Sequence, residues 1–216
     1  MVGILFDLDG TLLNTLEDLA DAVNYALGVY GCPQRTLEEI RTFVGNGVKK
    51  LLLRALPGKD TDPDFEEFFA VYRDYYALHN QDKTAPYPGV MEALERLKGE
   101  YPLAIVSNKH HSAVETMCRH YFGDLYARGE QPGCPRKPAP DMLLQSMQDL
   151  GVDKCIYVGD SEVDVATAKN AGVPCLSVLW GFRDKECLLQ AGATHFCENG
   201  SDLPQILKNM IEEYYG

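Results

Sequence analysis

The chain lacks the long apolar runs and the excess of basic residues that define several classes of protein. None of its apolar runs approaches the roughly 20 residues that a transmembrane helix needs. Its 216 residues include 20 Lys and Arg against 32 Asp and Glu, and this net charge of -12 argues against binding to a nucleic-acid backbone. The N-terminus has neither the basic start nor the small-residue cleavage site of a signal peptide. We therefore expect neither a membrane nor nucleic acid among its partners.

The sequence also lacks closely spaced cysteine pairs of the C-x-x-C type. The chain has seven cysteines, an odd number, and no C-x-x-C motif. Cys155, Cys175 and Cys197 lie within apolar runs. This pattern favours buried, reduced thiols over disulfides or a zinc site, and it predicts a cytoplasmic protein.

The most informative stretch is the apolar run at the start of the chain, from Val2 to Phe6, which predicts a short buried strand. The run ends at two carboxylates, Asp7 and Asp9, followed by Gly10. In open α/β sheets the ligand site lies outside the carboxyl ends of the strands, so this sequence would deliver two acids to such a site. The alternative is a strand followed by an acidic turn or helix cap with no ligand site. The motifs in the rest of the chain distinguish these two interpretations.

From about residue 14 to residue 83 the pattern is helical, with no convincing strand. Thr15 can cap the first helix, Thr36 opens the second with a capping box, and Asp62-Pro63 begins the last. A stretch rich in Pro and Gly follows at residues 84–89, and beyond it helices alternate with continuous apolar strands. Such alternation predicts a parallel sheet that is covered on both faces.

We therefore predict an α/β fold, with a doubly wound, Rossmann-like parallel sheet as the core and a helical domain inserted after the first strand. The core comprises residues 1–13 and 84–216, and the inserted cap comprises residues 14–83. Connections in α/β units are normally short, so an insertion of this length is the size of a domain. Because it leaves the sheet at the edge that carries Asp7 and Asp9, it is placed to act as a lid.

Polar side chains fall at four points where predicted strands end or loops follow: Asp7 with Asp9, Ser107 with Asn108, Lys137, and Asp160 with Asp164. Several carboxylates in one crevice would raise one another's pKa, and a hard divalent cation such as Mg²⁺ removes that repulsion. A carboxylate nucleophile beside Mg²⁺, a lysine and a hydroxyl donor suits phosphoryl transfer.

These points lie in Asp7-Leu8-Asp9-Gly10-Thr11-Leu12, Ser107-Asn108-Lys109, Arg136-Lys137-Pro138-Ala139-Pro140 and Gly159-Asp160-Ser161-x-x-Asp164. In this order they resemble the four motifs of the haloacid dehalogenase superfamily, and the resemblance covers nearly the whole chain. A shorter match, residues 43–48 with Arg54 following, resembles the helical cap of phosphoglycolate phosphatase-like members.

The resemblance implies a role for each matched residue in the core. Asp7 would attack phosphorus and form an aspartyl-phosphate, and Asp9 would protonate the leaving oxygen and then activate water. Mg²⁺ would be held by the Asp7 carboxylate, the Asp9 backbone carbonyl and Asp160. The phosphoryl oxygens would be bound by three residues: Ser107, the Asn108 amide and Lys137.

Further residues would support or complete this site. Asp164 would support the metal site or Lys137, and Thr15 would orient Asp9 at the hinge to the cap. Asn46 and Arg54 would contact the part of the substrate beyond the phosphoryl group from the cap. For Arg54, a surface position with no substrate contact is an equally good interpretation. Lys109 has two readings as well, a substrate contact or a solvated loop lysine.

The predicted function is a Mg²⁺-dependent phosphatase of a small phosphorylated metabolite, with 2-phosphoglycolate as the best guess. A phosphoglucomutase or a pyrophosphatase on the same scaffold stays open, as does a non-catalytic phosphometabolite sensor. A carbon–halogen hydrolase is disfavoured, because Asp9 supplies the acid that an oxygen leaving group needs. The physiological substrate and the oligomeric state are left open by the sequence.

Overall fold

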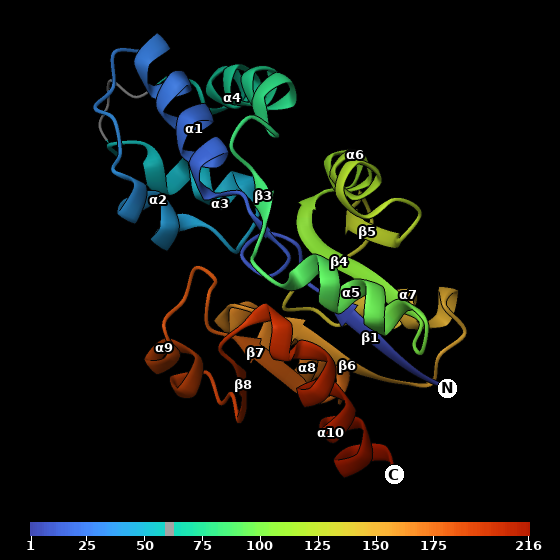
Figure 1. The fold of residues 1–216 in the computed structure, drawn as a ribbon. Coiled ribbons are helices and arrows are strands. Elements are labelled where there is room, and N and C mark those ends of the chain that lie inside the picture. The colour runs from blue at the N-terminus through green and yellow to red at the C-terminus, as the bar shows by residue number, and fades with distance from the viewer. Residues whose placement is uncertain (59–62) are drawn as a thin grey trace. The chain divides into compact units, whose positions relative to one another are not determined.

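The computed structural model describes residues 1–58 and 63–216 and forms two compact units (Figure 1). The sheet unit consists of Met1–Leu13 together with Pro86–Gly216. The helical unit consists of Asn14–Ala85. The chain therefore leaves the sheet unit once, after Leu13, and returns to it once, at Pro86.

The sheet unit is built on six parallel strands in the order β5-β4-β1-β6-β7-β8. The strands are β1 (Val2–Phe6), β4 (Leu103–His110), β5 (Tyr126–Glu130), β6 (Lys154–Gly159), β7 (Cys175–Val178) and β8 (His195–Cys197). The chain adds β4 and β5 on one side of β1, then crosses back to add the remaining strands on the other side. The strand order thus reverses beside β1, where ligand sites of open parallel sheets lie. The predicted doubly wound parallel sheet is confirmed.

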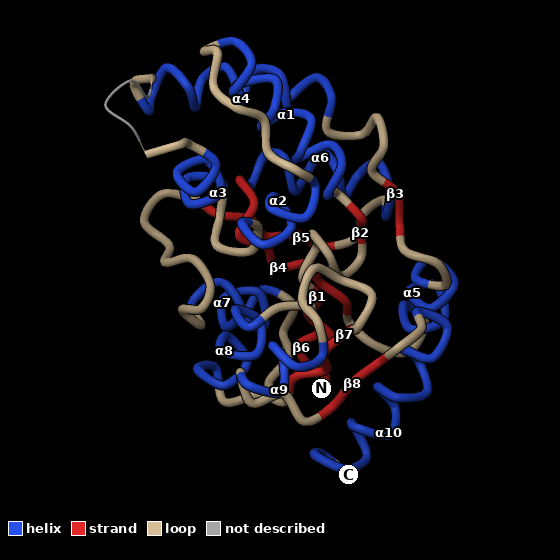
Figure 2. Tube along the Cα trace, turned by 90° about the vertical axis from the view of Figure 1, so that its left-hand side faces the viewer, coloured by secondary structure: helices blue, strands red, loops and turns tan. Residues whose placement is uncertain are grey.

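Helices cover both faces of this sheet, with α5 and α10 on one side of the strands and α7 and α8 on the other (Figure 2). Ile4 and Phe6 are buried in the core shared with α5, α6 and α10, whereas Leu5 is buried in the core shared with α7 and α8. This burial on both faces explains why the strands are continuously apolar. The helices are α5 (Val90–Lys98), α6 (His111–Phe122), α7 (Asp141–Asp149), α8 (Glu162–Ala171), α9 (Lys185–Gln190) and α10 (Leu203–Tyr215).

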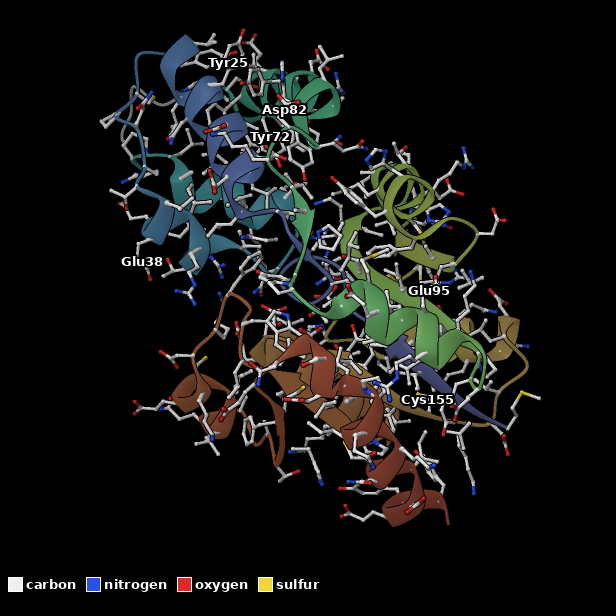
Figure 3. All side chains as sticks on the ribbon, in the orientation of Figure 1. Tyr25, Glu38, Tyr72, Asp82, Glu95 and Cys155 are labelled. Carbon is white, nitrogen blue, oxygen red and sulfur yellow. The ribbon has the colours of Figure 1, made fainter. Side chains whose placement is uncertain are left out.

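The described part of the helical unit contains α1 (Leu16–Val29), α2 (Leu37–Phe43), α3 (Val48–Ala55) and α4 (Phe65–His79). Helix α1, which carries Tyr25, packs along α4, which carries Tyr72 (Figure 3). Phe68 and Tyr72 are buried, and Tyr25 stacks on Tyr75 with 4.2 Å between ring centroids. Aromatic side chains therefore form much of the interface between these two helices. None of the helices in the described ranges combines the length and apolar character needed to cross a bilayer.

The helix starts agree only in part with the sequence prediction. Thr36 forms the expected capping box with Glu39, whose backbone N–H donates to Thr36 Oγ1 at 3.2 Å. Thr15 precedes α1, but its hydroxyl is buried and has no hydrogen-bond partner among the described residues, so the predicted side-chain cap is wrong. Helix α4 is capped by Asp64 and begins at Phe65. The predicted start included Asp62, which lies outside the described residues.

Strand β5 was not predicted, and β4 is longer than expected. The β5 segment carries no apolar run, because it lies at the edge of the sheet and most of its residues are partly exposed. Strand β4 continues past Val106 to His110, with an irregularity in its pairing to β5 between these two residues. A Cβ at Gly129 of β5 would lie 2.6 Å from the Lys109 carbonyl oxygen, so the two strands approach closely there.

The two chain crossings are tied together by local contacts. The short strands β2 (Leu13–Asn14) and β3 (Ala85–Pro86) pair with each other. Next to them, the buried Asp18 carboxylate on α1 accepts hydrogen bonds from the backbone N–H groups of Lys83 and Thr84, at 3.0 and 2.9 Å. The Thr84 hydroxyl adds a bond of 2.7 Å. A single carboxylate on the outgoing helix thus fixes the returning segment.

We expect Asp18→Ala to lower the free energy of unfolding of the helical unit by about 2–4 kcal/mol, because it leaves buried donors without an acceptor. Urea unfolding followed by circular dichroism measures this. The matched control is Asp21→Ala, which removes an exposed ion pair to Lys83 at 2.6 Å and should cost no more than about 1 kcal/mol. Equal losses in the two variants would show that the buried contacts of Asp18 do not stabilise the crossing.

Candidate active site

Asp7 lies directly beyond β1 and is largely buried. Its backbone N–H donates to the Val158 carbonyl of β6 at 2.8 Å, which extends the pairing of the two strands by one residue. One carboxylate oxygen, Oδ1, accepts from the Leu8 N–H at 2.7 Å and lies 2.9 Å from Lys137 Nζ. The other oxygen, Oδ2, accepts no hydrogen bond from the described residues. The carboxylate is therefore held through one oxygen while the other stays available.

Lys137 places its ammonium among three oxygen atoms. Besides Asp7 Oδ1, Nζ lies 2.8 Å from Asp164 Oδ1 and 2.8 Å from the Tyr157 hydroxyl, and the side chain is 2% exposed. Burial by itself lowers the pKa of a lysine, but Asp164 and Asp7 outweigh it and raise the pKa of Lys137. The lysine is therefore a permanent buried cation, and Tyr157, which was not predicted, helps to hold it.

Asn108 holds the loop that carries Lys137. Its side-chain oxygen accepts from the Lys137 N–H at 2.8 Å, and its side-chain nitrogen donates to the Lys137 carbonyl at 3.0 Å. The side-chain amide of Asn108 thus acts on the protein's own backbone. Ser107 is buried on the same strand, where its Oγ accepts from the Lys109 N–H at 3.3 Å. Binding of phosphoryl oxygens by Ser107 and Asn108 stays a prediction.

Asp160 follows β6 and sits in a close-fitting backbone cradle. Its Oδ1 accepts from the Thr11 hydroxyl at 2.9 Å, and its Oδ2 accepts from the Phe182 N–H at 2.8 Å. A Cβ at either Gly10 or Gly181 would collide with the Asp160 side chain, and Gly10 has a φ of 86°. Both glycines are required for Asp160 to lie this close to the end of β1.

Asp164 lies in the first turn of α8 and is fully buried. Its Oδ2 accepts from both the backbone N–H and the hydroxyl of Ser161, at 3.1 and 2.6 Å, which caps the helix. Its Oδ1 lies within hydrogen-bond distance of Lys137 Nζ and the Tyr157 hydroxyl. With two partners at each oxygen, Asp164 has no acceptor capacity left. This matches a supporting position behind Lys137.

The three carboxylates form a compact cluster that fits a divalent cation. Oxygen atoms of Asp7, Asp160 and Asp164 lie within 4.8 Å of one another. With the Lys137 ammonium, the four side chains carry a formal charge of -2 when ionised, which one divalent ion would neutralise. Lone pairs are left on Asp7 and Asp160, and carboxylate oxygens are the ligands that hard divalent cations prefer. Asp7 and Asp160 would therefore hold the ion.

Burial and the neighbouring negative charges both raise pKa values in the cluster. Burial raises the pKa of Asp7 to about 7, against the opposing effect of Lys137, and the charge on Asp164 adds to the rise. Burial likewise raises the pKa of Asp160 well above its usual value, and the charges on Asp164 and Asp7 contribute. A cation bound beside these two carboxyl groups would lower both pKa values and favour the ionised forms.

Asp9 is oriented by Lys109. Lys109 Nζ lies 3.0 and 2.9 Å from the two carboxylate oxygens of Asp9, and the two side chains are 8% and 15% exposed. Neither sequence reading of Lys109, a substrate contact or a solvated loop lysine, included this pair. The apolar run of β4 ends at Val106, so the sequence carries no signal that the strand continues to Lys109.

The remaining predicted site residues lie in the helical unit. Asn46 is in the turn between α2 and α3, and Arg54 lies on α3, where its guanidinium donates to the Phe43 carbonyl at 2.8 Å. Arg54 therefore braces the turn that contains Asn46. The predicted contacts of these two residues with substrate, and the predicted effect of Thr15 on Asp9, stay predictions.

Comparisons with known proteins agree with this geometry. The family model for haloacid dehalogenase-like hydrolases matches residues 4–178. A phosphoglycolate phosphatase of Mesorhizobium japonicum is 34% identical over 194 residues, covering 84% of each chain. A phosphoglycolate phosphatase of Aquifex aeolicus is 32% identical over 219 residues, covering 98% of this chain and 99% of its own.

The fold has close structural relatives as well. A crystal structure of a protein from Lactobacillus delbrueckii subsp. bulgaricus matches with a TM-score of 0.86 and 34% identity, covering 95% of this chain and 97% of its own. The resemblance found in the four sequence motifs is confirmed. The chain thus belongs to the haloacid dehalogenase-like hydrolase family, among its phosphoglycolate phosphatase-like members.

Proposed function

We propose that this hydrolase is a Mg²⁺-dependent phosphatase of small phosphorylated metabolites, with 2-phosphoglycolate as its substrate and Asp7 as its nucleophile. The observation that carries the proposal is the buried cluster of Asp7, Asp160 and Asp164 around Lys137. The names of the relatives supply the choice of substrate. Phosphate release from a panel of phosphorylated metabolites, ranked by kcat/KM, tests it.

Two half-reactions follow from the proposed roles. First, the free oxygen of Asp7 attacks phosphorus, the bond from phosphorus to the ester oxygen breaks, and Asp9 gives a proton to that oxygen. Then Asp9 takes a proton from water, the hydroxide attacks phosphorus, and the bond to Asp7 breaks to release inorganic phosphate. The same carboxyl group thus serves as acid and then as base.

The protein's own groups supply most of the required positioning. Leu8 N–H and Lys137 hold one oxygen of Asp7, so the attacking oxygen has a fixed direction. Lys137 is also a permanent positive charge beside the phosphoryl group that Asp7 receives. Mg²⁺ bound by Asp7 and Asp160, with the Asp9 backbone carbonyl, would neutralise the carboxylates and the phosphoryl oxygens.

Asp7→Asn should retain the fold and lose at least about 1,000-fold in kcat, because an amide does not form the acyl phosphate. Inorganic phosphate release measures the loss, and circular dichroism checks the fold. Asp124→Asn on the exposed surface is the matched control and should keep full activity. If Asp7→Asn kept more than about a tenth of the original kcat, covalent catalysis through Asp7 would be abandoned.

Removal of metal should abolish activity. We expect EDTA to stop turnover and Mg²⁺ to restore it, whereas Ca²⁺ should inhibit, since it accepts a looser geometry with more ligands. Titration calorimetry should show that Asp160→Asn weakens Mg²⁺ binding, while the exposed control Asp153→Asn does not. Full turnover in metal-free buffer would contradict the assignment of Asp160.

The helical unit should determine which substrate is used, because the carboxylate cluster recognises only the phosphoryl end. We expect Asn46→Ala and Arg54→Ala to lower kcat/KM for 2-phosphoglycolate about tenfold or more while sparing p-nitrophenyl phosphate. Arg73→Ala, at an exposed position on α4, is the control. Equal losses on both esters would mean that Asn46 and Arg54 support folding or closure, not selection.

The same assays separate the alternatives. A phosphoglucomutase would return an isomerised sugar phosphate instead of inorganic phosphate, and a pyrophosphatase would prefer inorganic pyrophosphate to every ester. A phosphometabolite sensor would bind a ligand and release nothing. Each of these outcomes would overturn the proposed function.

A further inference from the structure

The ion pair between Lys109 and Asp9 is built more tightly than a surface contact. A single ammonium lies within 3.0 Å of both oxygens of one carboxylate, and both side chains are largely buried. The residues are 100 positions apart, so the pair joins the loop after β1 to the far end of β4. A contact of this kind restrains the plane and the position of the Asp9 carboxylate, not merely its charge.

The backbone beneath Lys109 is itself fixed. The Lys109 N–H donates to Ser107 Oγ at 3.3 Å, and β4 continues to His110, which pairs with Glu130 of β5. The absence of a side chain at Gly129 lets β5 approach the Lys109 carbonyl, where a Cβ would lie 2.6 Å from that oxygen. Lys109 therefore reaches Asp9 from within β4, between the paired residues Val106 and His110, and a side chain that starts from such a fixed backbone suits a positioning role.

We propose that Lys109 is a positioning residue that holds the Asp9 carboxyl group in place for its proton transfers. This inference rests on the proposed function, in which Asp9 gives a proton to the leaving ester oxygen and later takes one from water. Asp9 directly precedes Gly10 in the turn after β1, and among the described residues its carboxylate oxygens have no hydrogen bond or ion pair to a side chain other than Lys109. Without Lys109 the carboxyl group would be free to rotate away from the ester oxygen.

The proposal predicts a dependence on the leaving group. An alkyl ester such as 2-phosphoglycolate releases a strongly basic oxygen that needs the proton from Asp9 as its bond to phosphorus breaks. The leaving oxygen of p-nitrophenyl phosphate is a stable anion and needs that proton much less. Loss of positioning at Asp9 should therefore slow the alkyl ester much more than the aryl ester. A merely structural role of Lys109 would slow both equally.

The experiment measures kcat/KM for both esters in Lys109→Met and Lys109→Gln, with Lys98→Met as an exposed control. We expect a loss of about 100-fold for 2-phosphoglycolate and less than about tenfold for p-nitrophenyl phosphate, within the range that general acid catalysis supplies. The glutamine variant keeps a donor and covers the case in which the methionine variant folds poorly. Equal losses on both esters in the folded variant would overturn the proposal.

A second measurement tests whether Lys109 acts through Asp9. In an Asp9→Asn background the acid is already absent, so adding Lys109→Met should change kcat/KM for 2-phosphoglycolate less than about threefold. An undiminished loss in that background would contradict action through Asp9. If the unmodified protein hydrolysed neither ester, the proposed function would fail and this role with it, whereas an active protein with equal losses would overturn the role of Lys109 alone.

Discussion

The structure depends on the way in which buried negative charge is balanced at the end of β1. Asp7, Asp160 and Asp164 crowd within 4.8 Å, and the Lys137 ammonium lies against two of them. Removing such charges from water is costly unless each group is paired and hydrogen-bonded. Asp164 meets this condition with protein groups alone, while Asp7 and Asp160 keep free lone pairs and raised pKa values. The hydrogen bonds of Asp164 are all made within the protein, but the cluster as a whole keeps an excess of negative charge. A divalent cation would neutralise that excess.

This requirement shapes the fold around the cluster. Parallel strands β1 and β6 bring Asp7 and Asp160 to one edge, and the reversal of strand order beside β1 leaves room there for a ligand. Gly10 and Gly181 are needed because Asp160 fills the space that their side chains would take. Helix α8 begins at the same edge, so Asp164 caps the helix and holds Lys137 with the same carboxylate. The hydrogen bonds of the Asp164 carboxylate therefore stabilise the fold and position Lys137 at the same time.

The helical unit contains none of the clustered carboxylates, so its stability depends on other contacts. Its interior is packed with side chains such as Phe68 and Tyr72, and its returning segment is fixed by the buried Asp18. The guanidinium of Arg54 braces the turn around Asn46 through the Phe43 carbonyl. A unit with its own core is able to vary its exposed residues without disturbing the sheet edge, which suits a role in substrate selection.

The fold class and most of the site were predictable from sequence, because both depend on local patterns. Continuous apolar strands alternating with helices imply a parallel sheet, and Asp7, Asp9, Lys137 and Asp160 fall where strands or loops end. Other features were decided by tertiary structure alone. Edge strand β5 has no apolar signal, since most of its residues are partly exposed. By its sequence pattern, Tyr157 is an ordinary buried residue of a strand. Only the tertiary structure places Lys137 beside it, where the Tyr157 hydroxyl accepts a hydrogen bond from the ammonium. Lys109 meets Asp9 across 100 residues because β4 runs beyond its apolar segment. A sequence pattern reports which side chains are buried or delivered to an edge, whereas the pairing of charges depends on distances that exist only after the strands have assembled.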